Sequence, residues 1–459
     1  MELKTMSLSA LKRKKIRKTD PKELIKMEDH RIHPKEHYHF SGHDTTVLAK
    51  EYGTPLYVMS EDFIRERMKT VNETFIKPYP KNKAAYASKA FISMHMCRIV
   101  ESEGFHLDVV SGGELYTAIQ ANFPMERVIF HGNNKSFDEI AMAVSAGVGR
   151  IVVDYEEEIG FIEEKAKELD KIPGIQLRVV PEVEGKTHRH IMTGQKDSKF
   201  GLPMNHDTML RIVGGIHRSE YMDFKGFHFH IGSNLYENDI YRRAIGRVMN
   251  LIKLMKDHFS IDTEELNTGG GFGIFYDDEN QRKPINYYTD AIMDEIEGLC
   301  QLHGLKVPSV IIEPGRWIVG EAGITIYEIG AIKEIPGVRK YISINGGIAD
   351  NIRPALYNAK YDAVVANKYD QEKNSLVSVA GKCCETGDIL IHDLKVPEVE
   401  RGDLLAVKST GAYNESMSSN YNRLPRPAVV FLKGNTSKLM AKRETYESIL
   451  QRERLAELS

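Results

Sequence analysis

The chain has 459 residues, of which 41% are hydrophobic and 28% charged, and its formal net charge is -3 at pH 7. This composition is ordinary for a globular protein, and the small net charge gives no reason to expect nucleic acid or a membrane as a partner. No apolar run approaches the roughly 18 residues that a membrane-spanning helix requires. The length predicts two or three domains of ordinary size.

A basic segment begins the chain, with lysines and arginines at positions 12–15 and 17–18. It has few large apolar residues and lacks the apolar core of about 7 to 15 residues that defines a signal peptide. Nucleic-acid binding is one interpretation of such a segment, but a solvated basic tail is the favoured one. We therefore interpret residues 1–40 as a peripheral basic arm.

The cysteines and histidines form neither a disulfide framework nor a metal site that the sequence can identify. The four cysteines, Cys97, Cys300, Cys383 and Cys384, have no regular spacing, which is typical of reduced thiols in a cytoplasmic protein. The two histidines at positions 188 and 190 lie near Asp197, but no third ligand is evident. We expect no metal.

Eight apolar runs of about four to eight residues each end on polar residues or glycine, and helix-like stretches separate most of them. This alternation predicts a (β/α)8 TIM-type barrel over residues 60–322, with an active site at the carboxyl ends of the strands. Lys89 ends the first run; a lysine is by default a surface residue, but at the mouth of a barrel it predicts chemistry. The runs occupy residues 84–89, 105–111, 127–132, 150–154, 175–181, 226–233, 265–271 and 309–316.

After Arg316 the pattern changes to short strands separated by turns. This predicts a β-sandwich or β-barrel domain over residues 323–435, which the early segment 41–59 joins. The fold class is then α/β plus β, and the β-domain is discontinuous in sequence. The charged segment 436–459 predicts a C-terminal helix.

Seven short motifs follow one another along the chain, at residues 86–90, 108–115, 229–233, 269–273, 313–316, 384–388 and 411–413. Each motif alone is weak, but in this order they resemble the pyridoxal-phosphate-dependent decarboxylases with an alanine-racemase-like barrel. The resemblance covers about residues 54–433 and is closest to the members that act on diaminopimelate. It implies the cofactor pyridoxal 5'-phosphate and the decarboxylation of meso-2,6-diaminopimelate to L-lysine and CO2, the last step of lysine biosynthesis.

The resemblance implies a role for each reactive group. Lys89 would bind the aldehyde carbon of the cofactor, Glu313 would keep the ring nitrogen protonated, and His230 would lie on the ring face. Without the resemblance, a histidine on an apolar strand is more often a core residue, and a glutamate at a strand end can serve only in a salt bridge.

A glycine run at residues 269–271 follows a predicted strand, where bare backbone amides can approach a phosphate. A structural turn would look the same. In the resembled family, Ser233 and Tyr413 also reach the phosphate. The full set of expected cofactor-binding residues is Lys89, Asp108, His230, Ser233, Gly270, Gly271, Glu313, Gly315, Arg316 and Tyr413.

The resemblance places Arg316, Arg353 and Tyr357 at the distal carboxylate of the substrate, with Glu385 at its distal ammonium group and Tyr413 beside them. Two guanidinium groups fit a carboxylate and would repel the bare ammonium of lysine or ornithine. The alternative is a decarboxylase of lysine, ornithine or arginine that yields a polyamine precursor, which the arginine pair disfavours. A catalytically inactive binding protein is a third alternative, which the intact reactive groups disfavour.

Cys384 is the expected proton donor to the carbon that loses CO2, because it directly precedes Glu385 as the family motif requires. A cysteine in a β-domain is otherwise usually a small buried hydrophobic residue. In the family this loop reaches the active site of the other subunit, which implies a homodimer with shared active sites. The chain departs from the family pattern at Lys382 and Asn345, and Lys382 could perturb the loop that carries Cys384.

Overall fold

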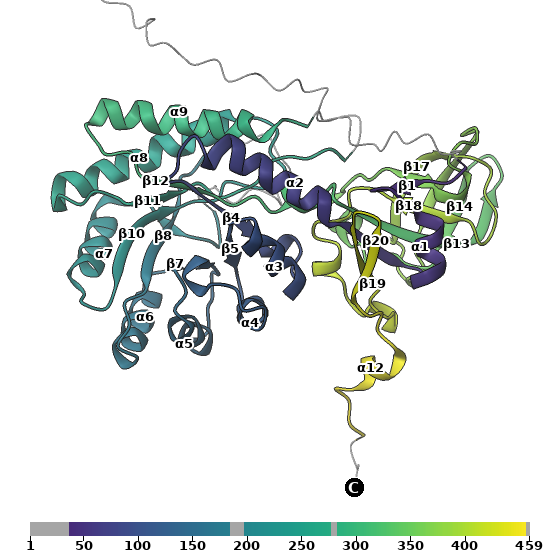
Figure 1. Cartoon of the computed structure of the whole chain (residues 1–459), viewed down its shortest axis with the longest axis horizontal. Coiled ribbons are helices and arrows are strands. Elements are labelled where there is room, and N and C mark those ends of the chain that lie inside the picture. Colours follow the sequence, from purple (N-terminus) through teal and green to yellow (C-terminus); the bar gives the residue numbers. More distant parts are fainter. Residues whose placement is uncertain (1–35, 184–196, 277–281, 456–459) are drawn as a thin grey trace, which may run out of the picture.

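The computed structural model describes residues 36–183, 197–276 and 282–455. Two units lie side by side, a barrel of alternating strands and helices and a smaller unit made mainly of strands (Figure 1). The first described residues belong to the β-unit, the chain then forms the barrel, and it returns to the β-unit. None of the helices in these ranges combines the length and apolar character that crossing a bilayer requires.

Eight parallel strands close into a barrel, because β10 pairs with β8 and β12 pairs with β4. This confirms the expected (β/α)8 fold. The strands are β4 (Lys83–Ala87), β5 (His106–Val109), β6 (Val128–Phe130), β7 (Arg150–Val153), β8 (Gly174–Val180), β10 (Asp223–His228), β11 (Glu265–Asn267) and β12 (Ser309–Ile312). The helices that follow them in turn are α3 (Met94–Ser102), α4 (Gly112–Gln120), α5 (Phe137–Ala146), α6 (Glu157–Glu168), α7 (His206–Arg218), α8 (Asp239–Phe259), α9 (Ile285–His303) and α10 (Arg316–Val319).

The barrel strands are covered on the outside by helices and filled on the inside by side chains, so they read as nearly continuous apolar runs. All seven residues of β8 and all three of β6 are buried. The long helix α8 buries an apolar face that includes Ile245, Val248 and Ile252 and leaves its charged residues outside. Polar side chains just beyond the carboxyl end of each strand therefore collect at one mouth of the barrel.

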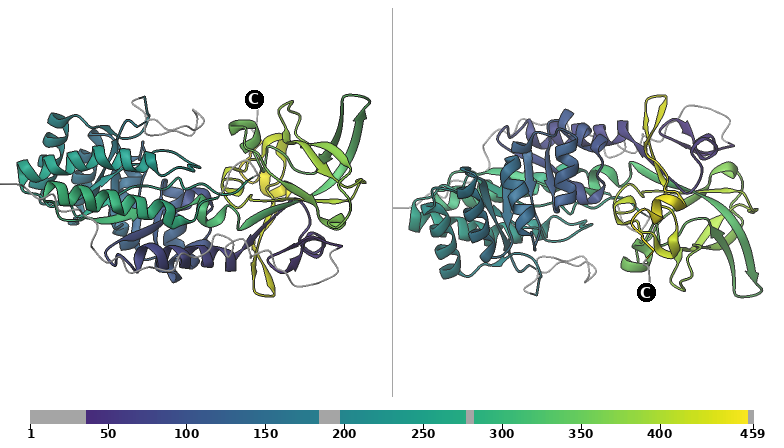
Figure 2. Two further views of the ribbon diagram at one scale, coloured as in Figure 1. Left: turned by 90° about the horizontal axis from the view of Figure 1, so that it is seen from above. Right: turned by 90° about the horizontal axis from the view of Figure 1, so that it is seen from below.

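The β-unit is built around β3 (Leu56–Ser60), which precedes the barrel in sequence. This strand pairs antiparallel with β13 (Gly323–Ile335) and parallel with β19 (Ala428–Lys433). The remaining elements of the unit are β1 (His39–Phe40), β2 (His43–Asp44), α1 (Thr45–Tyr52), β14 (Arg339–Ile344), α11 (Arg353–Tyr357), β15 (Ala363–Val365), β16 (Ser375–Ala380), β17 (Ile389–Val396), β18 (Leu404–Val407) and β20 (Thr436–Ala441). Views from above and below show this unit beside one side of the barrel, with α2 (Glu61–Val71) running between the two (Figure 2).

The structure differs from expectation at both ends of the described chain. The terminal helix expected over 436–459 is wrong, because β20 forms there and pairs with β19 across a turn at Gly434, whose φ is +53°. Up to residue 455, where the described chain ends, only a short helix follows, α12 (Tyr446–Leu450). Residues 1–35 of the expected basic arm lie outside the described residues, but its last part is structured: the backbone N–H of Tyr38 donates to Ala366 O at 2.7 Å.

Candidate active site

A cavity of about 200 Å³ lies at the carboxyl ends of the barrel strands, and residues of the β-unit form one of its walls. Most of the expected site residues line it: Lys89, His230, Ser233, Gly270, Gly271, Glu313, Gly315, Arg316, Arg353, Tyr357 and Tyr413. Asp108, Cys384 and Glu385 do not. Residues that lie far apart in the sequence thus meet in one enclosure, as the barrel geometry requires.

Lys89 lies in the turn that follows β4, one residue past the point where the strand becomes a 3-10 turn at Ser88. Its backbone is fixed from the β-unit: Ser416 Oγ donates to Lys89 O at 3.1 Å, and the N–H of Tyr413 donates to Ala90 O at 2.8 Å. Burial favours the neutral amine, but the charges of Asp108, Tyr413 and Glu313 raise the pKa of Lys89 above its ordinary value. The free cavity therefore holds an ammonium group.

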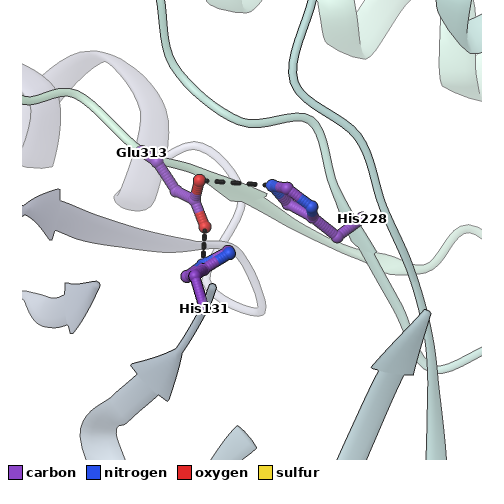
Figure 3. Close-up of side chains that lie close together, drawn as sticks. All are labelled: His131, His228 and Glu313. Atoms are coloured by element: carbon purple, nitrogen blue, oxygen red, sulfur yellow. Dashed lines mark ion pairs between the residues drawn. The ribbon is translucent and has the colours of Figure 1, made fainter. Parts of the chain in front are cut away.

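Glu313 directly follows β12, is buried and lines the cavity, and Figure 3 shows its carboxylate beside His131 and His228. Asn267, from the end of the neighbouring strand β11, donates Nδ2–H to Glu313 Oε1 at 2.6 Å. Burial opposes ionisation of this carboxyl, but His131 and His228 lower the pKa of Glu313 well below its ordinary value. The cavity thus pairs an ammonium group with a fixed carboxylate.

Two histidines flank Glu313 from across the barrel (Figure 3). His131 Nε2, just past β6, lies 2.8 Å from Glu313 Oε1, and His228 Nε2, at the end of β10, lies 3.4 Å from Glu313 Oε2. Burial lowers the pKa of His228 to about 3, so this ring is neutral at pH 7. Among the described residues, these three side chains form the one group with the ligand types and spacing of a metal site; the histidines at positions 188 and 190 lie outside those residues.

His230 and the glycine run meet at a second wall. The N–H of Gly270 donates to His230 Nδ1 at 3.4 Å, which agrees with burial and the nearby Lys89 holding the pKa of His230 well below its ordinary value. A Cβ on Gly270 would lie 2.0 Å from Glu313 O, and one on Gly271, whose φ is +102°, would lie 2.2 Å from Gly232 O. Only glycine allows these backbones to approach one another.

Two arginines, one from each unit, meet at the opposite wall. Arg316 donates to Ser233 Oγ at 2.9 Å and to the hydroxyl of Tyr276 at 2.5 Å, while Arg353 of α11 donates to the same hydroxyl at 2.9 Å. The guanidinium carbon of Arg316 also lies 4.5 Å from the ring centre of Tyr413. Burial raises the pKa of the Tyr276 hydroxyl, but the two guanidinium groups bring it below its ordinary value. This wall is therefore a site for an anion.

Three of the expected residues lie outside the cavity. Asp108, in β5, is buried behind Lys89, and burial raises the pKa of its carboxyl to about 6. Cys384 and Glu385 are exposed on the β-unit, where the N–H of Cys384 donates to Asn422 Oδ1 at 2.7 Å. Within one chain, the cavity holds neither the expected proton donor nor the expected partner of the distal ammonium.

Sequence reasoning missed four residues of the site: His228, Asn267, Tyr276 and Tyr361. His228 was within reach, because it lies two positions before His230 and alternate residues of a strand face the same side. Asn267 ends a predicted strand just before the glycine run, a similar but weaker signal. Nothing in the sequence pointed to Tyr276 or to Tyr361, whose hydroxyl accepts from Arg353 at 3.0 Å.

Known proteins resemble this chain in sequence and in fold. The family model for the pyridoxal binding domain of pyridoxal-dependent decarboxylases matches residues 61–320. The diaminopimelate decarboxylase of Bacillus subtilis is 46% identical over 415 residues, which are 90% of this chain and 94% of that protein. The crystal structure of diaminopimelate decarboxylase from M. jannaschii in complex with L-lysine has 34% sequence identity and a TM-score of 0.86, with 92% of this chain and 97% of that one covered. The chain therefore belongs to the pyridoxal-dependent decarboxylases and, within them, to the diaminopimelate decarboxylase family.

Proposed function

We propose that this protein binds pyridoxal 5'-phosphate and decarboxylates meso-2,6-diaminopimelate to L-lysine and CO2, the last step of lysine biosynthesis. The observation that carries this proposal is the meeting of Arg316 and Arg353 in the same cavity as Lys89 and Glu313. One wall can bind a carboxylate that does not react, while the other end holds the amine and carboxylate that pyridoxal chemistry needs.

The cavity residues fit pyridoxal phosphate. Lys89 provides an amine for its aldehyde, and the buried carboxylate of Glu313 can hold a proton on its ring nitrogen. Gly270 and Gly271 line the same cavity with backbone that carries no side chain, and Ser233 and Tyr413 supply hydroxyl groups beside Arg316. When bound, the cofactor supplies an electron sink for the bond that breaks as CO2 leaves.

The substrate is oriented by the wall that Arg316, Arg353 and Tyr276 form, which we call the anion wall. Arg316 and Arg353 would bind the distal carboxylate. Tyr357 lines the same cavity and would limit where that carboxylate can lie. Lysine and ornithine have no distal carboxylate, so they would leave two buried guanidinium groups with hydroxyl groups as partners and no carboxylate. The arrangement thus favours a diamino-diacid over the basic amino acids of the alternative function.

The remaining groups would come from a second subunit. Cys384 and Glu385 are exposed and lie outside the cavity of their own chain. In a homodimer with shared active sites, Glu385 of one subunit would bind the distal ammonium in the other, and Cys384 Sγ would donate the proton to the carbon that has lost CO2. The four cysteines are all free thiols, which supports a cytoplasmic location.

Product analysis tests the reaction directly. The purified protein, loaded with pyridoxal phosphate, is incubated separately with meso-diaminopimelate, lysine, ornithine and arginine, and the products are identified by mass spectrometry. We expect L-lysine and CO2 from the first and at most traces of diamine from the others. Comparable release of cadaverine, putrescine or agmatine would replace this proposal by the alternative function.

Subunit complementation tests the shared site. Lys89→Ala and Cys384→Ala variants are each expected to be inactive, and after subunit exchange at equal concentrations about a quarter of the wild-type activity should return, because half of the dimers are mixed and each of those has one intact site. Differently tagged subunits verify that exchange has taken place. If no activity returns after that, the shared site is contradicted.

A further inference from the structure

The cluster of Glu313, His131 and His228 contains two histidines to which the proposed reaction gives no role. Glu313 suffices as a partner for the cofactor, yet His131 and His228 approach it from two other strands and are almost fully buried. Three distant parts of the chain have thus placed titratable side chains around one carboxylate. Burying two imidazoles in this way is costly unless they serve the carboxylate.

We propose that His131 and His228 are positioning residues, which keep Glu313 ionised and turned toward the ring nitrogen of the cofactor. The inference rests on the proposed function only for the identity of that cofactor. It assigns to each histidine an action through Glu313 and no contact with the substrate.

The number of acceptor sites on the carboxylate supports this assignment. Two carboxylate oxygens offer about four positions for donors. Asn267 takes one at Oε1, His131 Nε2 approaches the same oxygen at 2.8 Å, and His228 Nε2 approaches Oε2 at 3.4 Å. Since Glu313 also lines the cavity, a position remains for one donor from the cavity side. A protonated ring nitrogen is such a donor.

The fit of the two histidines to Glu313 is incomplete without that donor. Neither Nε2 atom has hydrogen-bond geometry toward a partner among the described residues, although both lie close to the carboxylate. Hydrogen bonds of active sites are often poorly aligned in the free protein and tighten in the complex.

His131 has a second task, which is to separate two acids. Its Nε2 lies 3.8 Å from Asp108 Oδ1 and 2.8 Å from Glu313 Oε1, so the ring stands between two buried carboxyl groups. Its ring also packs edge-on against that of His228, with the centres 4.7 Å apart. Removal of His131 would bring the charges of Asp108 and Glu313 into direct opposition and favour protonation of one of them.

Cofactor binding gives a test that needs no turnover. The dissociation constants of pyridoxal phosphate and of its analogue with a carbon in place of the ring nitrogen are measured by absorbance and fluorescence for wild type, His131→Leu and His228→Leu. We expect each leucine variant to bind pyridoxal phosphate on the order of 10-fold more weakly, as for the loss of support to a charge-assisted hydrogen bond. Binding of the analogue should change less than about 2-fold, because it has no ring nitrogen for Glu313 to hold.

Two further sets of variants separate positioning from general disruption. His131→Gln and His228→Gln retain an N–H donor and should recover most of the preference for pyridoxal phosphate over the analogue. His106→Leu is the control, because it removes a half-buried histidine from the opposite end of the barrel, at the first residue of β5. It should leave that preference unchanged.

Defined results would overturn the inference. One is equal weakening for both ligands in the leucine variants, since the histidines would then support only the fold. Another is wild-type protein purified with stoichiometric zinc that both variants lose, since the histidines would then be metal ligands. If the wild type failed to bind pyridoxal phosphate at all, the proposed function would fail instead, so the two failures are distinguishable.

Discussion

Two buried glutamates lie at opposite ends of the same barrel and have opposite surroundings. Glu265, the first residue of β11, binds Lys83 of β4, accepts from Arg150 at 2.7 and 2.8 Å, and accepts from Gln176 at 2.8 Å. Glu313, just past β12, has one aligned donor, the amide of Asn267. Their burial is nearly equal, at 3% and 5% exposed. The difference lies in how completely each carboxylate is satisfied.

The partners of Glu265, which are Lys83, Arg150 and Gln176, form an ionic cluster at the end of the barrel opposite the cavity. We call this cluster the plug and its end of the barrel the lower end. Burial alone would raise the pKa of Glu265, but Arg150 and Lys83 lower it to about 2. At the cavity end, buried polar atoms of Asp108, His131 and His228 have no hydrogen-bond partner in the part of the chain that the structure describes. The carboxylate of Glu265 is saturated with donors and stabilises the fold, although Gln176 Oε1 beside it has no partner among the described residues, whereas the carboxylate of Glu313 retains capacity for a further donor. The contrast separates structural charge from functional charge within one barrel.

The largest expected effect concerns the two lysines at the ends of β4. Lys89→Ala should abolish turnover and the absorbance band of the bound cofactor, because the amine that binds the aldehyde is removed. Lys83→Ala should leave turnover and the absorbance band intact and lower only the free energy of unfolding, because Lys83 pairs with Glu265 in the plug. Turnover and spectra of both purified variants decide the matter. Peptide mapping after borohydride reduction that labelled a lysine other than Lys89 would break the comparison.

A glutamine at the lower glutamate tests the plug itself. Glu265→Gln leaves Lys83 and Arg150 without their anion, and breaking a buried ion pair on one side typically costs about 3 to 5 kcal/mol. We expect that loss in the free energy of unfolding, measured with urea, with cofactor absorbance unchanged in the folded protein. A folded variant without the absorbance band would show that the lower end also serves the cofactor.

Specificity at the upper end should depend on the arginine that the β-unit supplies. Losing one partner of a buried charged pair typically costs about 2 to 5 kcal/mol, so Arg353→Ala should lower kcat/KM for meso-diaminopimelate by on the order of 30-fold or more. Steady-state kinetics measures this, and the exposed Arg401→Ala provides a control on the same unit. A loss of less than about 3-fold would mean that the anion wall does not bind the distal carboxylate.

Acid should weaken the two ends in different pH windows. The pKa of His228 is lowered to about 3 in the folded chain, so the unfolded chain binds the extra proton and stability falls as pH drops below about 6.5. The slope for one such group is about 1 kcal/mol per pH unit. The pKa of Glu265 is lowered to about 2, so its contribution is complete above about pH 4.5 and is lost as pH falls toward 2.

Urea unfolding of the cofactor-free protein at pH 7, 6 and 5 measures the first window. His228→Gln should show a shallower decline than the wild type over this range, whereas Glu265→Gln should decline in parallel with it. Parallel decline of all three proteins would assign the slope to other groups.

The sequence allowed prediction of the barrel and most of its mouth for a physical reason. Parallel strands buried on both faces are apolar runs, and a polar residue that ends such a run has only the mouth to occupy. Lys89 was predicted in this way, while the roles of His230 and Glu313 came from the family resemblance, and the cavity brings the three together. The helix expected at the C-terminus was wrong because residues 436–441, with Lys438 as their one charged residue, form an exposed edge strand, β20, whose burial alternates weakly.

Contacts made across the two units could not be read from the sequence. The hydroxyl of Tyr276 lies between Arg316 and Arg353, but the tyrosine belongs to the loop after β11 and Arg353 to a short helix of the β-unit. No local pattern marks such a meeting, because it depends on how one unit covers the other. Cys384 and Glu385 are exposed on the β-unit, and a place for them in an active site depends on contact with a second subunit, which no local pattern marks either. Their roles stay predictions.

The place of β3 has a consequence for the order in which the chain can fold. Its five residues, all buried in the native sheet, are synthesised before the barrel, whereas β13 and β19, which flank it, are synthesised after the barrel. A growing chain therefore exposes an apolar strand, without its native partners, while all eight barrel strands emerge from the ribosome. Pairing over such a separation is slow, and an unpaired apolar strand is prone to aggregate. The barrel therefore forms while β3 still lacks the two strands that flank it in the native sheet. We expect this enzyme to be more prone to aggregation during its synthesis than in its mature state.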